Sequence, residues 1–294
     1  MTGELLALLA ALAYGVAGVA IVRGKATAQG DNGVFLSVLA TAVLTFALWL
    51  GWGRVPPREL ADPAHALPLA VFALAGLFSI AFGRQTMYRA TERIGAVRAS
   101  LLRRLTPVFA LPFAYLLLAQ LPGARTILGG AVIVAGVLFY RPGSDRTAGD
   151  VPAAGVLLGI ASAAFYAAAY TLRRFGMDWL PDAALGACIG ALTGCLWFVA
   201  GALLRRDRGQ ALRRLLADRG RWHWLTALSL SIGQTLQFFA LKSAAVAVVA
   251  VIGTMEVFFS AALVMAMGGV RAVPIARLAP AAALAAIGTA LLLL

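Results

Sequence analysis

The chain has 294 residues, of which 62% are hydrophobic and 13% are charged. A soluble domain of this size carries about a quarter charged residues and about half apolar ones. The composition therefore excludes a soluble enzyme, a secreted disulfide scaffold and a disordered chain. The apolar residues gather in runs of about twenty, the length that a helix needs to cross about 30 Å of hydrocarbon. These features predict a polytopic membrane protein.

Ten such runs follow one another along the chain. We expect each to be a transmembrane helix, because backbone in contact with lipid must satisfy its own hydrogen bonds. Residues typical of helix ends and turns separate them, such as Gly-Asp-Asn-Gly at 30–33. The predicted spans are 4–22, 33–53, 67–90, 95–119, 124–141, 151–175, 182–204, 222–242, 244–267 and 274–294.

The net charge of +13 lies mainly in the connections, where anionic lipid headgroups attract Lys and Arg. The expected partner is thus the lipid bilayer and not a nucleic acid. The most basic connection, 205–221, is interpreted either as a short amphipathic helix on the membrane surface or as a solvated loop. Lys and Arg are in excess on the side opposite to the termini, which predicts that both termini lie outside.

No pattern of residues supports metal, cofactor or catalytic chemistry. His65 and His223 are solitary and fall near span ends, where an interfacial imidazole is expected. Cys188 and Cys195 are seven residues apart on one predicted helix, about 10 Å, which is too far for a disulfide. The first residues lack a basic region before the apolar run, so we expect no cleavable signal peptide. We therefore predict neither an enzyme nor a resident cofactor.

The two halves of the chain resemble each other. A shift of 152 residues places Tyr14 on Tyr166, and a shift of 149 places Gln85-Thr86 on Gln234-Thr235. The halves are 1–146 and 147–294, with five predicted spans in each. Because five is odd, the second half must enter the membrane from the opposite side. The predicted fold is all-α, with ten transmembrane helices as two inverted five-helix repeats around a central cavity, which is typical of transporters.

Charged residues within the predicted spans are the first candidates for a substrate site. Arg103 and Arg104 lie in the fourth span, and Glu256 lies in the ninth at a nearly equivalent place of the repeat. Charge at this depth usually faces a bundle interior or a wet cavity. One interpretation is a cavity with a cationic and an anionic pole; the other is an ion pair that only holds the halves together.

Tyrosines and glutamines form a second candidate group. Tyr14 and Tyr166 are related by the repeat, as are Gln85 and Gln234, and Tyr88 follows Gln85 on the same helix face. Apolar walls with a few placed hydrogen-bonding groups would suit a small amphipathic solute. The alternative is that these side chains bond between helices as part of ordinary packing.

Glycines spaced four apart in the seventh span, Gly186, Gly190 and Gly194, predict a close helix contact. We expect packing inside the chain, with a homodimer through these glycines as the alternative.

The sequence resembles the drug/metabolite transporter superfamily, in particular its EamA-type exporters, a branch that includes amino-acid exporters. The resemblance rests on the ten spans and the repeat, on Gly-Ala-Val-Arg-Ala-Ser-Leu-Leu and Leu-Thr-Pro-Val-Phe-Ala within 95–110, and on Leu-Leu-Ala-Leu-Leu-Ala-Ala-Leu-Ala-Tyr at 5–14. It implies that an aromatic residue of the first span and residues of the third, fourth, eighth and ninth spans line a central cavity. The matching positions here are Tyr14, Gln85, Arg103, Gln234 and Glu256.

The chain departs from the family pattern at Arg103–Arg104, where relatives are usually apolar or carry an amide, and at Glu256, which takes the place of the repeat's proline. Relatives are usually drawn with cytoplasmic termini, the opposite of the orientation that the charges predict.

Together these features predict a secondary transporter of small metabolites in a bacterial-type inner membrane, with both termini on one side. The resemblance implies an amino-acid exporter that works by alternating access, either facilitated or proton-coupled. Arg103 or Arg104 would then meet a substrate carboxylate, and Glu256 an amine or a coupling proton. One alternative is efflux of cationic drugs, with Glu256 as the binding group. A remote one is a polytopic lipid-modifying enzyme, for which no catalytic constellation is present.

Overall fold

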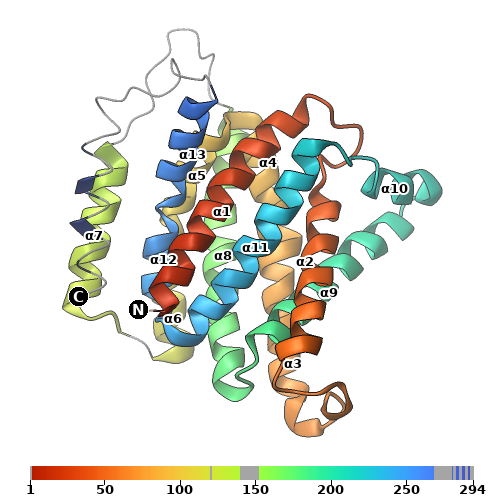
Figure 1. Ribbon diagram of the computed structural model, residues 1–294, viewed down its shortest axis with the longest axis horizontal. Helices are drawn as coiled ribbons and strands as arrows, with labels where there is room; N and C mark the ends of the chain where they lie inside the picture. The colour runs from red at the N-terminus through yellow and green to blue at the C-terminus, as the bar shows by residue number, and fades with distance from the viewer. Residues whose placement is uncertain are drawn as a thin grey trace.

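A computed structural model describes residues 2–119, 121–139 and 152–267, together with the isolated positions 280, 283, 284, 287, 288 and 291. The predicted tenth span, 274–294, and the boundary between the predicted halves at 146/147 therefore lie outside the continuously described residues. The described part is helical throughout and contains no strand (Figure 1).

The helices of the first half lie where the apolar runs predict them. The short helices η1 and η2 fill the connection that follows α2, and three helices continue one another between residues 66 and 94. The bounds are α1 Thr2–Lys25, α2 Val34–Trp52, η1 Pro57–Glu59, η2 Pro63–His65, α3 Ala66–Gly76, η3 Leu77–Arg84, α4 Gln85–Ile94, α5 Ala96–Leu102, η4 Arg103–Leu105, α6 Thr106–Leu118 and α7 Ala124–Phe139.

The helices of the second half repeat this order as far as it is described. The basic connection forms a short helix, α10, so the helical interpretation of 205–221 is confirmed. The bounds are α8 Ala153–Trp179, α9 Ala183–Leu203, α10 Arg208–Leu215, α11 Arg221–Ser243, α12 Val246–Gly253 and α13 Glu256–Ala266.

Six helical segments of the described chain are long and apolar enough to cross a membrane, judged by length and composition. They are Thr2–Lys25, Val34–Trp52, Pro63–Ile94, Ala153–Trp179, Ala183–Leu203 and Val246–Ala266. Large apolar side chains also cover the outside of the bundle; Leu116 and Leu196, for example, are 75% and 68% exposed. Polar side chains are instead found inside, the arrangement expected of a protein whose solvent is lipid.

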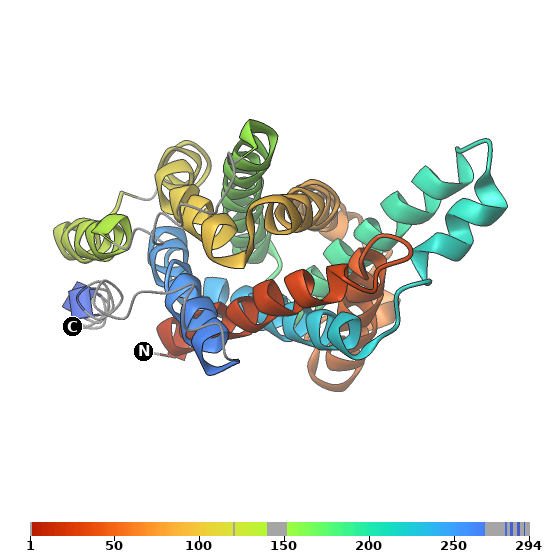
Figure 2. The same cartoon turned by 90° about the horizontal axis from the view of Figure 1, so that it is seen from above.

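The packing of the helices is symmetrical under exchange of the two halves. α1 packs along α11 and against α12 and α13, just as α8 packs along α3, η3 and α4 and against α5 and α6. α2 and α9 occupy equivalent places in the two halves and pack against each other. Seen from above, α7 lies at one edge of the bundle and α10 protrudes at the opposite edge (Figure 2).

Small residues allow a close contact between α3 and α9. A Cβ atom built on Gly76 would lie 2.4 Å from the carbonyl oxygen of Gly190, so the two backbones touch. Gly186 faces the ring of Phe72, and Gly194 faces Ile80. The three glycines of α9 are thus buried within the chain, as the first interpretation of their spacing expects. The alternative, a homodimer through these glycines, stays a prediction.

Aspartates hold the connections at both ends of α2 and α9. Asp31 precedes α2 and accepts hydrogen bonds from the backbone N–H of Gly33 and Phe35, at 3.0 and 2.8 Å. Asp182 precedes α9, accepts from Leu185 N–H at 2.9 Å and also binds the backbone of Arg54 and Val55, just beyond α2. Both caps satisfy N–H groups that a helix start leaves without partners. Their sequence separation of 151 residues agrees with the repeat.

Asp218 ties the connection after α9 to the loop before α2. Its carboxylate accepts hydrogen bonds from the backbone N–H of Gln29, Gly30 and Asn32, at 2.6, 3.0 and 2.7 Å. Asn32 and Gly33 have φ of 59° and 75°, a left-handed turn that suits these residue types. The loop 26–33 is thereby held against α10 and its connection.

Candidate functional site

Two interrupted helices meet in the middle of the bundle. The fourth predicted span breaks at η4, where Pro107 in the first turn of α6 cannot donate a backbone hydrogen bond to continue the α5 ladder. The ninth breaks at Thr254 and Met255, between α12 and α13. Irregular backbone at membrane depth is tolerated where it is buried in protein, and in transporters such breaks often form the binding site.

An ion pair joins these breaks. Arg103 Nη1 lies 3.1 Å from Glu256 Oε1, and both side chains are only 8% exposed. Nη1 of Arg103 also lies 3.0 Å from the sulfur of Met87. Glu256 is the first residue of α13, where the helix dipole favours a negative charge. Two of the three charged residues that the sequence singles out thus lie together, although they are 153 residues apart.

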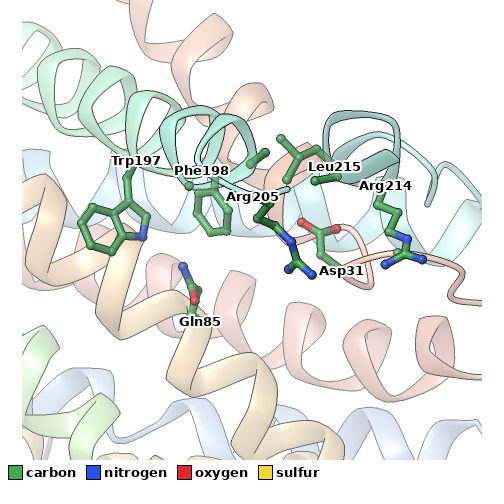
Figure 3. Close-up of a pocket in the computed structure, with 11 residues that line it drawn as sticks. Asp31, Gln85, Trp197, Phe198, Arg205, Arg214 and Leu215 are labelled. Carbon is green, nitrogen blue, oxygen red and sulfur yellow. The ribbon is translucent and has the colours of Figure 1, made fainter. Parts of the chain in front are cut away.

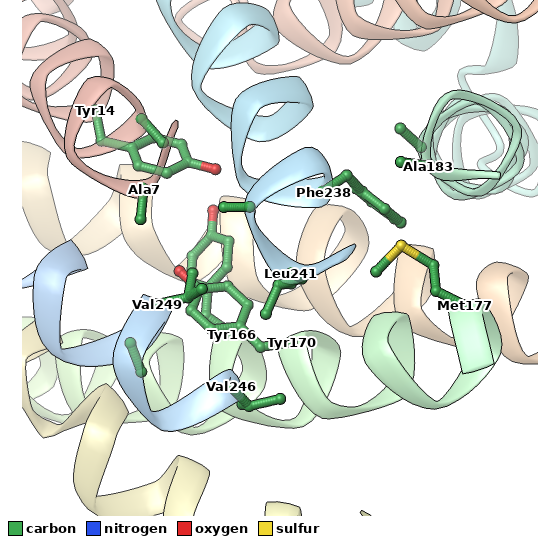
Figure 4. Packing of buried hydrophobic residues seen from close by; sticks show 14 of the residues in the cluster. Ala7, Tyr14, Tyr166, Tyr170, Met177, Ala183, Phe238, Leu241, Val246 and Val249 are labelled. Atoms are coloured by element: carbon green, nitrogen blue, oxygen red, sulfur yellow. The ribbon is translucent and has the colours of Figure 1, made fainter. Parts of the chain in front are cut away.

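The repeat-related tyrosines surround this pair. The guanidinium carbon of Arg103 lies 5.4 Å from the ring centre of Tyr14 and 4.9 Å from that of Tyr166, within the range of cation–π attraction. Tyr170, one turn from Tyr166, packs beside it at a centroid distance of 6.3 Å (Figure 4). The hydroxyl of Tyr14 donates to Gln237 Oε1 at 3.3 Å, and the hydroxyl of Tyr166 donates to Met87 Sδ at 3.8 Å.

These contacts correct the register of the repeat in the third and eighth spans. Tyr14 contacts Gly233 and Gln237, whereas Tyr166 contacts Gly83 and Met87, so the partners are 150 residues apart and not 149. Gln234 therefore corresponds to Arg84, and the predicted pairing of Gln85 with Gln234 is wrong. The π-helix η3, which has no π-helical counterpart described in α11, ends at Arg84, directly before Gln85.

Gln85 and Tyr88 lie away from the ion pair. Gln85 lines a pocket of about 400 Å³ near the ends of α9 and α10, which we call the outer pocket (Figure 3). Tyr88 is buried, points toward the carbonyl of Gly33 at 3.5 Å and lines a neighbouring pocket of about 240 Å³ that also contains Gln85. The outer pocket is lined by Gly30, Asp31, Gln85, Trp197, Phe198, Gly201, Ala202, Arg205, Ala211, Arg214 and Leu215.

Two buried arginines complete the interior, and the sequence did not single them out. Arg84 and Arg173 are each 1% exposed, whereas the hydropathy pattern assigned them to span ends and connections. Arg84 donates to Gln234 Oε1 at 2.7 Å, and Arg173 donates to Gln237 Oε1 at 2.9 Å. The usable signal was the pair of glutamines one turn apart on α11, since amide oxygens buried in lipid need donors. The side chain of Arg104 lies outside the described residues.

The predicted central cavity is closed in this structure. The space among Arg103, Glu256 and their neighbours amounts to about 10 Å³, room for about one water molecule. A solute can enter only if the residues around this space move apart. The residues that line this space, the central pocket, are Tyr14, Ser100, Arg103, Thr106, Tyr170, Ala250, Gly253, Thr254 and Glu256.

His223 is not the interfacial imidazole that its position near a span end predicts. It is 2% exposed, and its Nδ1 accepts a hydrogen bond from Gly220 N–H at 3.1 Å. Within the described ranges, no three His, Cys, Asp or Glu side chains gather in a way that would hold a metal ion.

We expect Asp31, in the loop at the outer pocket, to make stability depend on pH. Burial, reinforced by the nearby Asp218 carboxylate, raises the pKa of Asp31 from 3.8 to about 6. The folded protein then binds more protons than the unfolded chain between pH 4 and 6, so the free energy of unfolding falls by about 2 kcal/mol as the pH rises through this window. Thermal unfolding of the detergent-solubilised protein at pH 4.5 to 7 measures this loss.

The Asp31→Asn variant should lack this component of the pH dependence, whereas the same change at the exposed Asp62 should leave it in place. Identical pH profiles for wild type and Asp31→Asn would contradict the prediction.

The fold and the site define a class of protein: a helical membrane protein with polar and charged residues buried between two broken helices, as in transporters. Residues 1–141 match the model of the EamA-like transporter family, which confirms the resemblance to the drug/metabolite transporters. A solved structure described as "Crystal structure of protein" has the same fold, with a TM-score of 0.73 at 18% identity over 99% of this chain and 96% of that chain. The comparison with curated proteins gives no match.

Proposed function

We propose that the chain is a secondary transporter that exports amino acids across a bacterial-type inner membrane by alternating access. In this proposal residues 1–146 and 147–294 are two inverted five-helix repeats, both termini lie on one side, and transport is either facilitated or coupled to protons. The expectations of a small-molecule substrate and of no catalytic activity belong to the same proposal.

The exchange symmetry of the helix packing supports the two repeats. α1 and α8 take equivalent places, each along the polar helix of the opposite half, and both halves carry a broken helix at the same position. With five spans in each half, equivalent helices run in opposite directions. This is the arrangement in which one central site can be exposed first to one side of the membrane and then to the other.

The ion pair between Arg103 and Glu256 is the observation from which we infer the class of substrate. A free amino acid brings a carboxylate and an ammonium group, and each can replace one partner of the pair without changing the charge buried in the membrane. Because Arg103 belongs to the first half and Glu256 to the second, admission of such a solute would also separate the halves. Ligand binding and opening of the closed central pocket are thereby linked.

The charge of the interior argues against the alternative of cationic drug efflux. Three arginines, Arg84, Arg103 and Arg173, are buried in the bundle with Glu256 as the one buried carboxylate that faces them among the described residues. A cationic solute would meet net repulsion there, in a medium where charge interactions are poorly screened.

Transport by purified protein in liposomes tests the proposal. We expect exchange of labelled amino acids above the rate of protein-free liposomes, with amino acids competing better than a cationic dye. The double variant Arg103→Gln/Glu256→Gln keeps a neutral hydrogen-bonding pair and should lower exchange by at least about tenfold. Repeating the assay with a pH gradient distinguishes proton coupling from facilitated transport. Dye transport that amino acids fail to inhibit would favour the drug-efflux alternative instead.

A further inference from the structure

The interior of the bundle holds more positive charge than its own residues compensate. Arg103 is paired with Glu256, but no carboxylate of the described residues lies within 4 Å of Arg84 or Arg173. A buried ion without a counter-ion is strongly unfavourable, particularly at membrane depth. Two guanidinium groups therefore remain to be neutralised.

The hydrogen bonds of these arginines also indicate that an anion is missing from the interior. Arg84 donates to Ser37, Thr41 and Gln234, and Arg173 donates to Gln237, so amide and hydroxyl oxygens are already in use. On these three arginines and on Gln234, the buried nitrogens that still have no partner are all donors: Arg84 Nε, Arg103 Nε, Arg173 Nε and Nη2, and Gln234 Nε2. An interior with donors left over is complementary to a ligand rich in acceptor oxygens. Water can accept these bonds, but it brings no charge.

Arg173 is connected to the central pocket through a short chain of contacts. Its Nη1 and the hydroxyl of Tyr14 both donate to Gln237 Oε1, and the ring of Tyr14 lies against Arg103. Its guanidinium also lies 4.4 Å from the ring centre of Phe238, which belongs to the same buried hydrophobic cluster as the tyrosines (Figure 4). A group bound at Arg173 would thus be next to a solute held between Arg103 and Glu256.

We infer that Arg173, supported by Arg84, forms an anion-binding subsite, and that the solute carries a second acidic group. The inference rests on the proposed amino-acid transport and narrows its substrate to the acidic amino acids. The α-carboxylate and the ammonium group bind Arg103 and Glu256, and the side-chain carboxylate binds the free nitrogens of Arg173. Arg fits this role because its planar group can donate two parallel hydrogen bonds to one carboxylate.

Binding of glutamate and glutamine to the purified full-length protein, measured by calorimetry, tests the subsite, because the two ligands have nearly the same shape and differ in one charge. We expect glutamate to bind at least about tenfold more tightly. Arg173→Gln should abolish this preference, and Arg84→Gln should reduce it.

A stability measurement keeps the test independent of folding defects. Because Arg173 is an uncompensated buried cation, the ligand-free Arg173→Gln variant should have a Tm equal to or above that of wild type. Arg174→Gln is the matched control: this neighbour binds Asp178 and the carbonyls of Leu241 and Lys242, and its loss should not change the ratio of the two affinities. A lowered Tm in Arg173→Gln with an unchanged affinity ratio would show a structural role and overturn the inference.

A third ligand, glutarate, separates this inference from the proposed function. Glutarate has both carboxylates of glutamate but no ammonium group. Equal affinity for glutamate and glutamine overturns the anion subsite and leaves amino-acid transport standing. Glutarate binding as tightly as glutamate supports the subsite but contradicts a role for the ammonium group, and hence the amino-acid proposal. Absence of binding by all three ligands contradicts both.

Discussion

Glu256→Gln is expected to destabilise the protein strongly, by about 3–5 kcal/mol, because it leaves the guanidinium of Arg103 buried without its anion. Arg103 is held between two tyrosine rings and the sulfur of Met87, none of which can neutralise it. Thermal unfolding in detergent measures the effect. The exposed pair Arg58–Glu59 supplies the control, since Glu59→Gln at a surface ion pair should change stability by less than about 1 kcal/mol.

The double variant Arg103→Gln/Glu256→Gln should recover most of the stability that Glu256→Gln loses. Two amides of similar shape can bond each other, and no buried charge remains. The pair could bind substrate, or it could only hold the halves together, and stability and transport measured together distinguish these roles. If the double variant is as stable as wild type but does not transport amino acids, the pair has a role in substrate binding. If the double variant is no more stable than Glu256→Gln, the loss does not come from the unpaired charge.

The sequence predicts the helices well because their signal is local. Within the described residues, up to 267, each apolar run between charged or Gly/Pro connections becomes helical over nearly the predicted residues, and Pro107 marks the break in the fourth span. The meeting of Arg103 with Glu256 could also be anticipated, because both charges lie at equivalent depths of the repeat and a charge inside a span requires a partner. These predictions need only periodicity, length and charge.

Side-chain direction was harder to predict, as Gln85 and Gln234 show. The similarity of Gln85-Thr86 to Gln234-Thr235 sets the repeat one residue away from the structural register. In the structure Arg84, the last residue of the π-helix η3, takes the place that the alignment gives to Gln85 and bonds Gln234. A local change of helix type has no clear signature in a sequence this apolar, and the error moves a candidate residue from the interior to the outer pocket.

The buried position of Arg173 was missed for a related reason. The apolar run ends near residue 175, and an arginine close to a span end is expected to reach the membrane surface. The helix α8 in fact continues to Trp179, and Arg173 turns inward to Gln237 and Phe238. Whether the side chain of Arg173 points into the bundle or toward the membrane surface depends on the neighbouring helix α11. The polar residues of that helix lie more than 60 positions away in the sequence. Composition near a span end does not contain that information.

Gly76→Ala is expected to destabilise the bundle by about 1–3 kcal/mol, because the added methyl group overlaps backbone that cannot rotate away. Its Cβ would lie 2.4 Å from the carbonyl oxygen and 2.5 Å from the Cα of Gly190, so α3 and α9 would have to move apart. The contact is unequal, which provides an internal control. A Cβ on Gly190 would meet its nearest atom, the Cα of Gly76, at 3.3 Å, and Gly190→Ala should therefore cost much less.

Gly51, near the end of α2, serves as the second control, since no atom lies within 4 Å of its built Cβ and alanine is the better helix former. The expected order of Tm is therefore Gly51→Ala at or above wild type, then Gly190→Ala, then Gly76→Ala. Equal effects at Gly76 and Gly190 would mean that the two helices are not held at the distance on which this argument depends. Because η3 and Arg84 follow Gly76 directly, a shift of α3 should also weaken the contact between Arg84 and Gln234, and transport should fall with stability in this variant.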